Sequence, residues 1–174
     1  MTEEQRKLCT CLIGDPLFPK GRISKEEFLR RFPSAVEQGK LASRWFEEAC
    51  IEQNAKDLQC AFIIGCKFGL APEQVDILPG LLEADWHFNH EDIVSCLDDL
   101  RSPRFVEAFY RATQWVPEYL DYDDVRSLAT KAIWALGNIG NSEAKEKLEA
   151  LTRSDHPVLR REAEYQLKRL RETT

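Results

Sequence analysis

Apolar residues recur at spacings of three and four along most of the chain, which is the pattern of amphipathic helices. Glycine and proline interrupt this pattern at helix-sized intervals. No segment shows sustained alternation of apolar and polar residues, which argues against strands. The pattern therefore predicts an all-α fold.

Several segments carry the signals of individual helices. Residues 2–12 form a first candidate helix, and Ser24-Lys-Glu-Glu27 is a capping box that opens a short second one before Pro33. Pro72 suits the first turn of a helix that runs to about Ala84. Further apolar positions at helical spacing are Leu41, Trp45, Phe46, Ala49, Leu58, Ala61, Phe62, Gly65, Cys66, Ile93, Leu97 and Leu100, and we expect Phe105, Phe109 and Ala112 to face inward. Ser102-Pro103 is expected to cap and start the helix that contains Phe105.

The C-terminal half contains an internal repeat. Residues 97–113 match residues 136–152 at an offset of 39, and residues 124–139 match residues 155–170 at an offset of 31. Asp124 and Asp155 hold the same place ahead of a helix, where an aspartate side chain would cap the N-terminus. Paired core positions in the second match are Leu128 with Leu159, Ala132 with Ala163, and Leu136 with Leu167. A period of this length predicts helical hairpins stacked into an alpha-alpha superhelix, a solenoid that forms a single domain.

The segment 124–151 resembles the bacterial HEAT repeat of the type first noted in phycobilisome lyases. Its most specific part is Ala135-Leu-Gly-Asn-Ile-Gly140, followed by Glu143-Ala144. The resemblance implies HEAT-like repeats over residues 90–172. Residues 1–89 fit the pattern only loosely, and we interpret them as degenerate helical hairpins or an N-terminal cap continuous with the repeats as one domain. The repeat implies a fold and a tendency towards protein binding, because its Ala, Leu and Gly positions serve packing.

Composition and charge narrow the choice of partner and location. The chain has 174 residues, its N-terminus is charged, and its longest apolar run, 60–66, is too short to cross a membrane. We therefore expect a cytoplasmic protein. The net charge of -6 argues against nucleic acid or an anionic membrane as partner. The six cysteines include no C-x-x-C pair, so we expect reduced, mostly buried thiols.

Candidate chemistry is sparse. His87-Phe-Asn-His90, with Glu91, Asp92 and Cys96, is the grouping that most resembles metal ligands. A second ligand cluster is missing, and these residues suit a helix start in which Asn89 caps and the acids favour the helix dipole. The sequence also lacks G-x-S-x-G, P-loop and G-x-G-x-x-G motifs. We therefore predict no metal, no cofactor, no catalytic residue and no enzymatic activity.

Acidic and aromatic residues concentrate in the middle of the chain. Residues 83–124 contain eleven acidic and three basic residues, a net charge of -8, whereas residues 125–174 carry a net charge of +3. Five aromatic residues of this region lie in two connectors, 85–92 and 114–124: Trp86, Phe88, Trp115, Tyr119 and Tyr122. They predict an acidic, aromatic ridge suited to a basic protein partner. Alternatively, the aromatic rings close the ends of the hairpin cores and the acids only solvate the loops. The predicted partner-binding residues are Trp86, His87, Glu91, Asp92, Trp115, Glu118, Tyr119, Asp121, Tyr122, Asp123 and Asp124.

A second resemblance gives the functional hypothesis. Residues 86–170, with Trp115-Val-Pro-Glu-Tyr and the segment 131–140, resemble small bacterial HEAT proteins encoded beside Rhs-type polymorphic toxins. This implies an immunity protein that binds the basic catalytic domain of a cognate toxin and blocks its active site or its access to a target. The alternatives are a generic HEAT scaffold or adaptor, a bilin-lyase or chaperone-like protein suggested by the repeat subtype, and a HEAT-like DNA-repair glycosylase. The last fold usually presents a basic groove, whereas the excess charge here is acidic.

Overall fold

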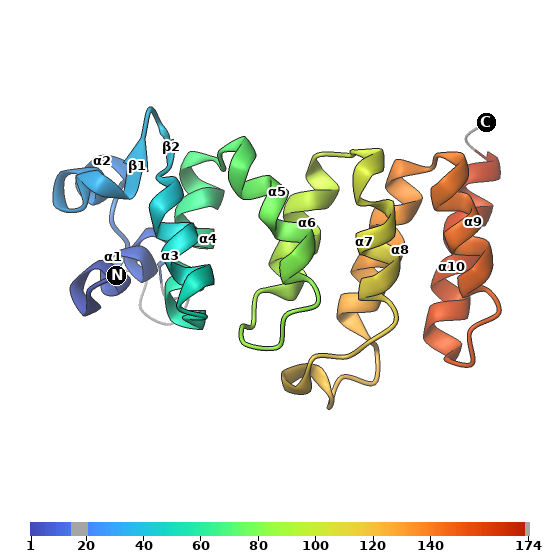
Figure 1. Ribbon diagram of the computed structural model, residues 1–174. Coiled ribbons are helices and arrows are strands. Elements are labelled where there is room, and N and C mark those ends of the chain that lie inside the picture. The colour runs from blue at the N-terminus through green and yellow to red at the C-terminus, as the bar shows by residue number, and fades with distance from the viewer. Residues whose placement is uncertain (15–20, 173–174) are drawn as a thin grey trace. The chain divides into compact units, whose positions relative to one another are not determined.

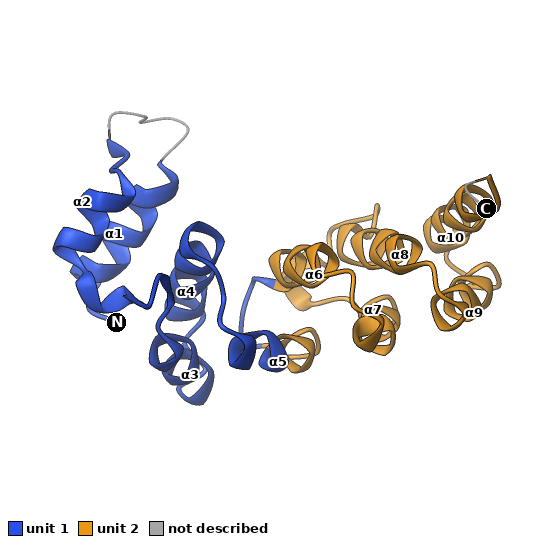
Figure 2. Cartoon of the chain, turned by 90° about the horizontal axis from the view of Figure 1, so that it is seen from above, with its two compact units in different colours: residues 1–77, 86–89 blue, residues 78–85, 90–174 orange. Residues whose placement is uncertain are grey.

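The fold is all-α, as the apolar spacing predicts. A computed structural model describes residues 1–14 and 21–172, and these residues contain ten α-helices and one very short hairpin (Figure 1). The chain divides into two compact units, residues 1–77 with 86–89 and residues 78–85 with 90–174 (Figure 2). The division passes through α5 (Pro72–Leu81).

The first unit is built around α4 (Ala55–Phe68), which packs against α1 (Glu3–Ile13) and α3 (Ser43–Ile51). The short helix α2 (Lys25–Arg31) packs against α1. Ser24 caps α2 as the sequence predicts, because its hydroxyl accepts the Glu27 N–H. Thr2 and Gln5 form a complete capping box on α1, which we did not predict from the sequence. The buried side chains include Phe28, Phe46, Leu58 and Ile64.

A two-stranded hairpin precedes α3, and the sequence pattern did not predict it. Strands β1 (Val36–Glu37) and β2 (Lys40–Leu41) pair antiparallel across Gln38 and Gly39, which both have positive φ. Two residues of positive φ are what a tight hairpin turn requires. Strands of two residues are too short to produce visible alternation, so Leu41 was wrongly grouped with the helix that follows.

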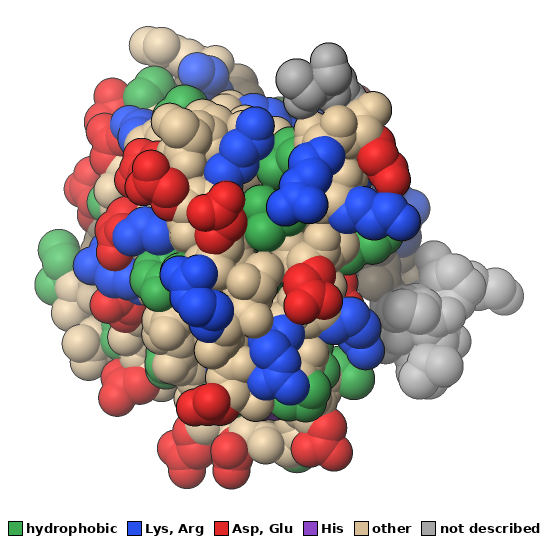
Figure 3. Space-filling model, turned by 90° about the vertical axis from the view of Figure 1, so that its right-hand side faces the viewer, with side chains coloured by type: hydrophobic (Ala, Val, Ile, Leu, Met, Phe, Trp, Pro, Cys, Tyr) green, Lys and Arg blue, Asp and Glu red, His purple; other side chains and the backbone are tan. Residues whose placement is uncertain are grey.

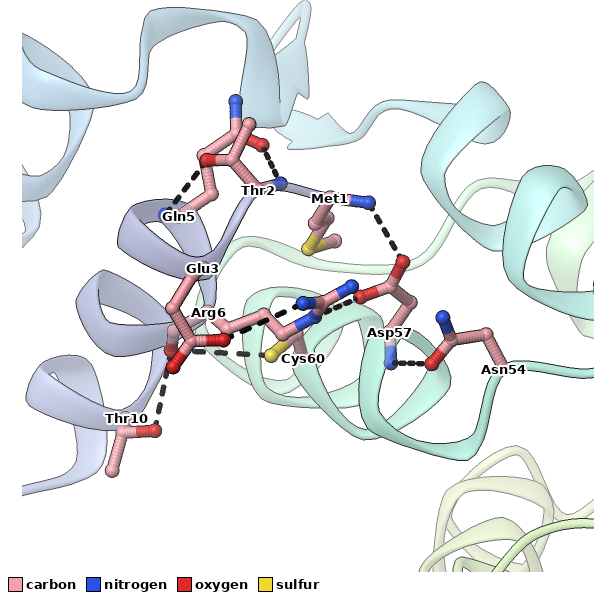
Figure 4. A network of polar contacts seen from close by, with 9 residues as sticks. All are labelled: Met1, Thr2, Glu3, Gln5, Arg6, Thr10, Asn54, Asp57 and Cys60. Atoms are coloured by element: carbon pink, nitrogen blue, oxygen red, sulfur yellow. Dashed lines mark hydrogen bonds and ion pairs between the residues drawn. The ribbon is translucent and has the colours of Figure 1, made fainter.

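A buried ion cluster joins α1 to α4 (Figure 4). The carboxylate of Asp57 accepts from the Arg6 Nε at 2.6 Å and from the α-amino group of Met1 at 2.7 Å. Burial alone would raise the pKa of Asp57, but these two hydrogen bonds outweigh it and lower the pKa below its usual range. The cluster therefore stabilises the packing of α1 on α4 with Asp57 in its charged form.

The cysteines differ in exposure more than expected. None of the six forms a disulfide, but only Cys9 and Cys60 are buried, while Cys66 is exposed and Cys11, Cys50 and Cys96 are half-buried. The prediction of mostly buried thiols is therefore confirmed for Cys9 and Cys60 and wrong for the other four.

The second unit consists of two layers of helices. One layer contains α6 (His90–Asp99), α8 (Ser127–Ile139) and α10 (Pro157–Glu172), and the other contains α7 (Val106–Ala112) and α9 (Ser142–Leu151) (Figure 2). Helix α8 contacts the other four helices of the unit, and α10 contacts α8 and α9.

The core of this unit follows the internal repeat. The buried positions of α8 match those of α10, with Leu128, Ala132 and Leu136 in one helix and Leu159, Ala163 and Leu167 in the other. The predicted Phe105, Phe109 and Ala112 are buried as well. Leu100 is an exception, because it lies past the end of α6 and is 50% exposed. Ser102 precedes a 3-10 turn at Pro103–Phe105 but makes no side-chain cap.

The aspartate that bonds the N-terminus of α8 lies one residue earlier than the repeat suggested, and the N-cap residue itself, Arg126, makes no side-chain cap. Asp124 is exposed, whereas the Asp123 carboxylate accepts the Ser127 N–H at 2.6 Å, the Val125 N–H at 3.2 Å and the Ser127 hydroxyl. These bonds lower the pKa of Asp123. The shift arises because Arg126 adopts a left-handed conformation, with φ of 52°, directly before the helix.

A polar side chain lies inside the α8–α10 contact. Gln166 is fully buried, and neither amide atom has a hydrogen-bond partner. Gly137 faces it across the interface, where an added Cβ would lie 2.8 Å from the Gln166 Cδ. Gly137 is therefore needed because Gln166 fills the space that a larger residue would take.

Candidate interaction surface

The second connector folds around His90, at the first turn of α6. The His90 Nε2 lies 2.7 Å from the Ala84 carbonyl oxygen, and Nδ1 lies 3.0 Å from the Tyr119 hydroxyl. Because a carbonyl only accepts, Nε2 carries the proton and Nδ1 accepts from Tyr119. Burial lowers the pKa of His90 and raises the pKa of Tyr119 to about 12, so both groups are neutral at pH 7.

Aromatic packing completes this cluster. The Trp115 ring stands edge-on to His90 with centroids 5.3 Å apart, and the Tyr119 ring lies 5.6 Å from His90. The Trp115 Nε1 is buried without a protein partner, beside a cavity of about 10 Å³ that Leu120 and Asp123 also line. A cavity of that size has room for one water, which would accept this N–H. Trp115 and Tyr119 are thus half-buried packing residues that fix the connector on α6.

Two predicted acidic residues are engaged within the second unit. Glu91 pairs with Lys131 at 2.9 Å and accepts the Ser127 hydroxyl at 3.3 Å. Asp123 caps α8, as described above. Asp92 lies exposed on α6. The carboxylates of Glu91 and Asp123 therefore stabilise the junction of α6, α8 and the connector.

The remaining predicted residues form an exposed group on the same connector. Glu118, Asp121, Tyr122 and Asp124 are all exposed, and their side chains make no hydrogen bond or ion pair to another described residue. Val125 follows them and is 64% exposed, and Tyr122 is 82% exposed. We call these five residues the connector patch.

The first connector contributes differently. Trp86 and His87 belong to the first unit, and the other predicted residues belong to the second. The Trp86 ring is half-buried and meets His87 edge-on at 5.0 Å, while His87 is fully buried and its Nδ1 accepts the Asn89 N–H at 3.1 Å. Phe88 is 64% exposed. Among the described residues, no three His, Cys, Asp or Glu side chains are grouped in a way that could hold a metal ion.

Sequence reasoning missed an aromatic surface on the layer of α6, α8 and α10. Trp134 of α8 is 39% exposed and Tyr165 of α10 is 51% exposed, with ring centroids 5.6 Å apart. The offset of 31 residues that relates the two helices places Trp134 on Tyr165. The sequence therefore did indicate this surface, because an aromatic residue recurs in both helices at a position outside the buried positions of the repeat.

Charges of both signs are interspersed on the side of the molecule where α9 and α10 lie. In that view, lysine and arginine side chains alternate with acidic ones and form no single basic area (Figure 3). On this face basic side chains are therefore mixed with acidic ones, whereas the connector patch contains carboxylates without a base.

Comparison of the chain with protein-family models, with curated proteins and with solved structures finds no match. Within the part of the chain that the structure describes, no helix combines the length and the apolar character needed to span a membrane.

Proposed function

We propose that the chain is a protein-binding module, an immunity protein that binds and neutralises the basic enzymatic domain of a cognate polymorphic toxin in the cytoplasm. The observation that supports this is the connector patch, whose three carboxylates and Tyr122 have no internal partner. The resemblance of residues 86–170 to small HEAT immunity proteins supplies the class of partner.

The physical basis is charge and anchoring together. Three unpaired carboxylates attract a basic surface, raise the rate of encounter and select against acidic partners. Tyr122 adds a large amphipathic ring of the kind that carries much of the binding free energy at protein interfaces.

The residues beneath the connector patch reduce the conformational entropy that is lost on binding. Pro117 and Leu120 are buried, and Tyr119 is hydrogen-bonded to His90, so the connector is held on α6 before a partner arrives. A surface that is already ordered loses less conformational freedom on binding than a mobile loop does.

The test is a toxicity assay with a charge-reversed patch. The toxin domain encoded beside this chain is expressed alone, with the wild-type chain, and with the triple variant Glu118→Lys, Asp121→Lys and Asp124→Lys. Asp123 is left unchanged because it caps α8. Wild type should protect the cells, and the variant should lose protection and bind the purified domain at least about tenfold more weakly.

A matched control separates the patch from net charge. Glu146→Lys, Glu149→Lys and Glu164→Lys make the same change of charge at three exposed residues of the second unit that form no described ion pair. This control should keep full protection. Equal killing with and without the wild-type chain, together with no complex on size-exclusion chromatography, would refute the proposed function.

A further inference from the structure

The geometry points to a second binding surface, on the exposed side of α6 and α8, where a groove beside Trp134 receives an arginine side chain from a protein partner. The groove has a volume of about 290 Å³ and is lined by Val94, Ser95, Asp98, Thr130, Lys131 and Trp134. This surface is separate from the connector patch and does not depend on the partner being a toxin.

Trp134 is held in place from the α10 side. Its Nε1 donates to the Glu162 carboxylate at 3.1 Å, and its ring is 5.6 Å from Tyr165 and 5.7 Å from the Arg169 guanidinium. These contacts come from α10, whereas the groove lies towards α6. The indole is therefore a fixed platform that a partner can contact with little loss of side-chain freedom.

Asp98 supplies an oriented carboxylate in the groove. Its two oxygens lie 3.1 and 2.9 Å from the Asn138 Nδ2, and the Asn138 Oδ1 accepts from Arg169 at 2.9 Å. Asp98 also pairs with the exposed Arg101 at 3.7 Å. Each carboxylate oxygen can accept more than one hydrogen bond, so a guanidinium in the groove adds to this contact or displaces Arg101.

The charge around the groove favours a cationic occupant. Helix α6 carries Glu91, Asp92, Asp98 and Asp99 and no lysine or arginine. The only basic residue of α8 is Lys131, and it is paired with Glu91. Of the residues that line the groove, Asp98 is acidic and Lys131 is basic. The excess of acids lies in the rest of α6, so the surrounding surface favours a positively charged side chain.

Arginine fits this combination better than lysine. Its planar guanidinium can stack on an indole face and also donate two hydrogen bonds to a carboxylate. A lysine ammonium is a compact, strongly hydrated charge that cannot make both contacts with the same geometry.

The internal repeat explains why the groove lies where it does. Ser95, Trp134 and Tyr165 occupy equivalent positions in α6, α8 and α10, at the offsets of 39 and 31 residues. All three are exposed and lie outside the buried core of their helices. The small Ser95 leaves open the space that an aromatic residue fills in the other two helices.

The test uses N-acetyl-arginine amide as the probe and nuclear magnetic resonance of the full chain. The Trp134 indole N–H signal, identified by its loss in Trp134→Phe, should shift saturably with a Kd on the order of 10 mM. The citrulline analogue, which is neutral and has nearly the same shape, should cause no saturable shift. The lysine analogue should bind more weakly than arginine.

Two variants make the result decisive. Asp98→Asn should weaken arginine binding at least about fivefold, whereas the triple variant of the connector patch should bind the probe as wild type does. No saturable shift up to about 100 mM, an equal response to citrulline, or an unchanged Kd in Asp98→Asn would each overturn the proposal. The connector-patch variant also separates this outcome from a failure of the proposed function.

Discussion

Gln166 offers a direct test of how the second unit is packed. Its side chain is fully buried between α8 and α10, and neither the amide oxygen nor the amide nitrogen has a partner. A buried polar group without a hydrogen bond costs about 1–3 kcal/mol. Methionine has nearly the same length, is unbranched and carries no strong donor or acceptor. We therefore expect Gln166→Met to raise the free energy of unfolding by about 2 kcal/mol.

Urea unfolding followed by circular dichroism measures this change, and thermal unfolding provides a second readout. For a chain of this size, about 2 kcal/mol corresponds to an increase in Tm of about 4–8 °C. Gln59→Met on the exposed side of α4 is the control. It should alter stability by less than about 0.5 kcal/mol, because the two residues have similar helix propensities.

A Gln166→Met protein that is less stable than wild type would refute the reasoning. It would mean that the amide is hydrogen-bonded in solution, through water, and contributes to stability. Gly137→Ala tests the contact itself and should destabilise by about 1–3 kcal/mol, because the new methyl group overlaps the Gln166 side chain. In a Gln166→Ala background the cost of Gly137→Ala should fall, which a double-mutant cycle would show.

Three further predictions follow from the caps, turns and buried charges. Asp123→Ala should lower the Tm, while Asp124→Ala should leave it unchanged, because only Asp123 caps α8; a larger effect at Asp124 would contradict this assignment. Gly140→Ala should cost about 1–2 kcal/mol in urea unfolding, because residue 140 has a φ of +61° and a Cβ would meet Leu170. Asp57→Asn should destabilise the chain at pH 7, and the difference from wild type should shrink below about pH 4. The folded pKa of Asp57 is lowered, so its contribution is present above the unfolded pKa and is lost as the pH falls through the folded value; a gap that stays constant down to pH 3 would contradict this.

Apolar spacing predicted the core of the second unit because burial of one helix face leaves a direct mark on the sequence. Leu128 and Ala132 lie in the core for the same reason that Leu159 and Ala163 do, and the repeat made this visible. The repeat predicted that Asp124 would cap α8, whereas Asp123 bonds the helix. Arg126, directly before the helix, has a left-handed conformation, and an alignment of repeats does not record backbone conformation.

Composition could not predict which aromatic side chains of the second connector are packed and which are exposed. Trp115 and Tyr119 pack on His90, whereas Tyr122, three residues later, is almost fully exposed. Which ring reaches His90 depends on a contact between segments more than twenty residues apart. Trp134, by contrast, could have been found, because the spacing of the α8 core leaves it on the polar side and the repeat places Tyr165 at the same position.

The equivalent positions of Ser95, Trp134 and Tyr165 also bear on how such a chain can change over generations. Each is exposed on a helix whose opposite side forms the core. A mutation at one of them alters what the surface recognises without disturbing the packing beneath it. A lineage can therefore follow a changing partner through single substitutions, each of which leaves a folded protein.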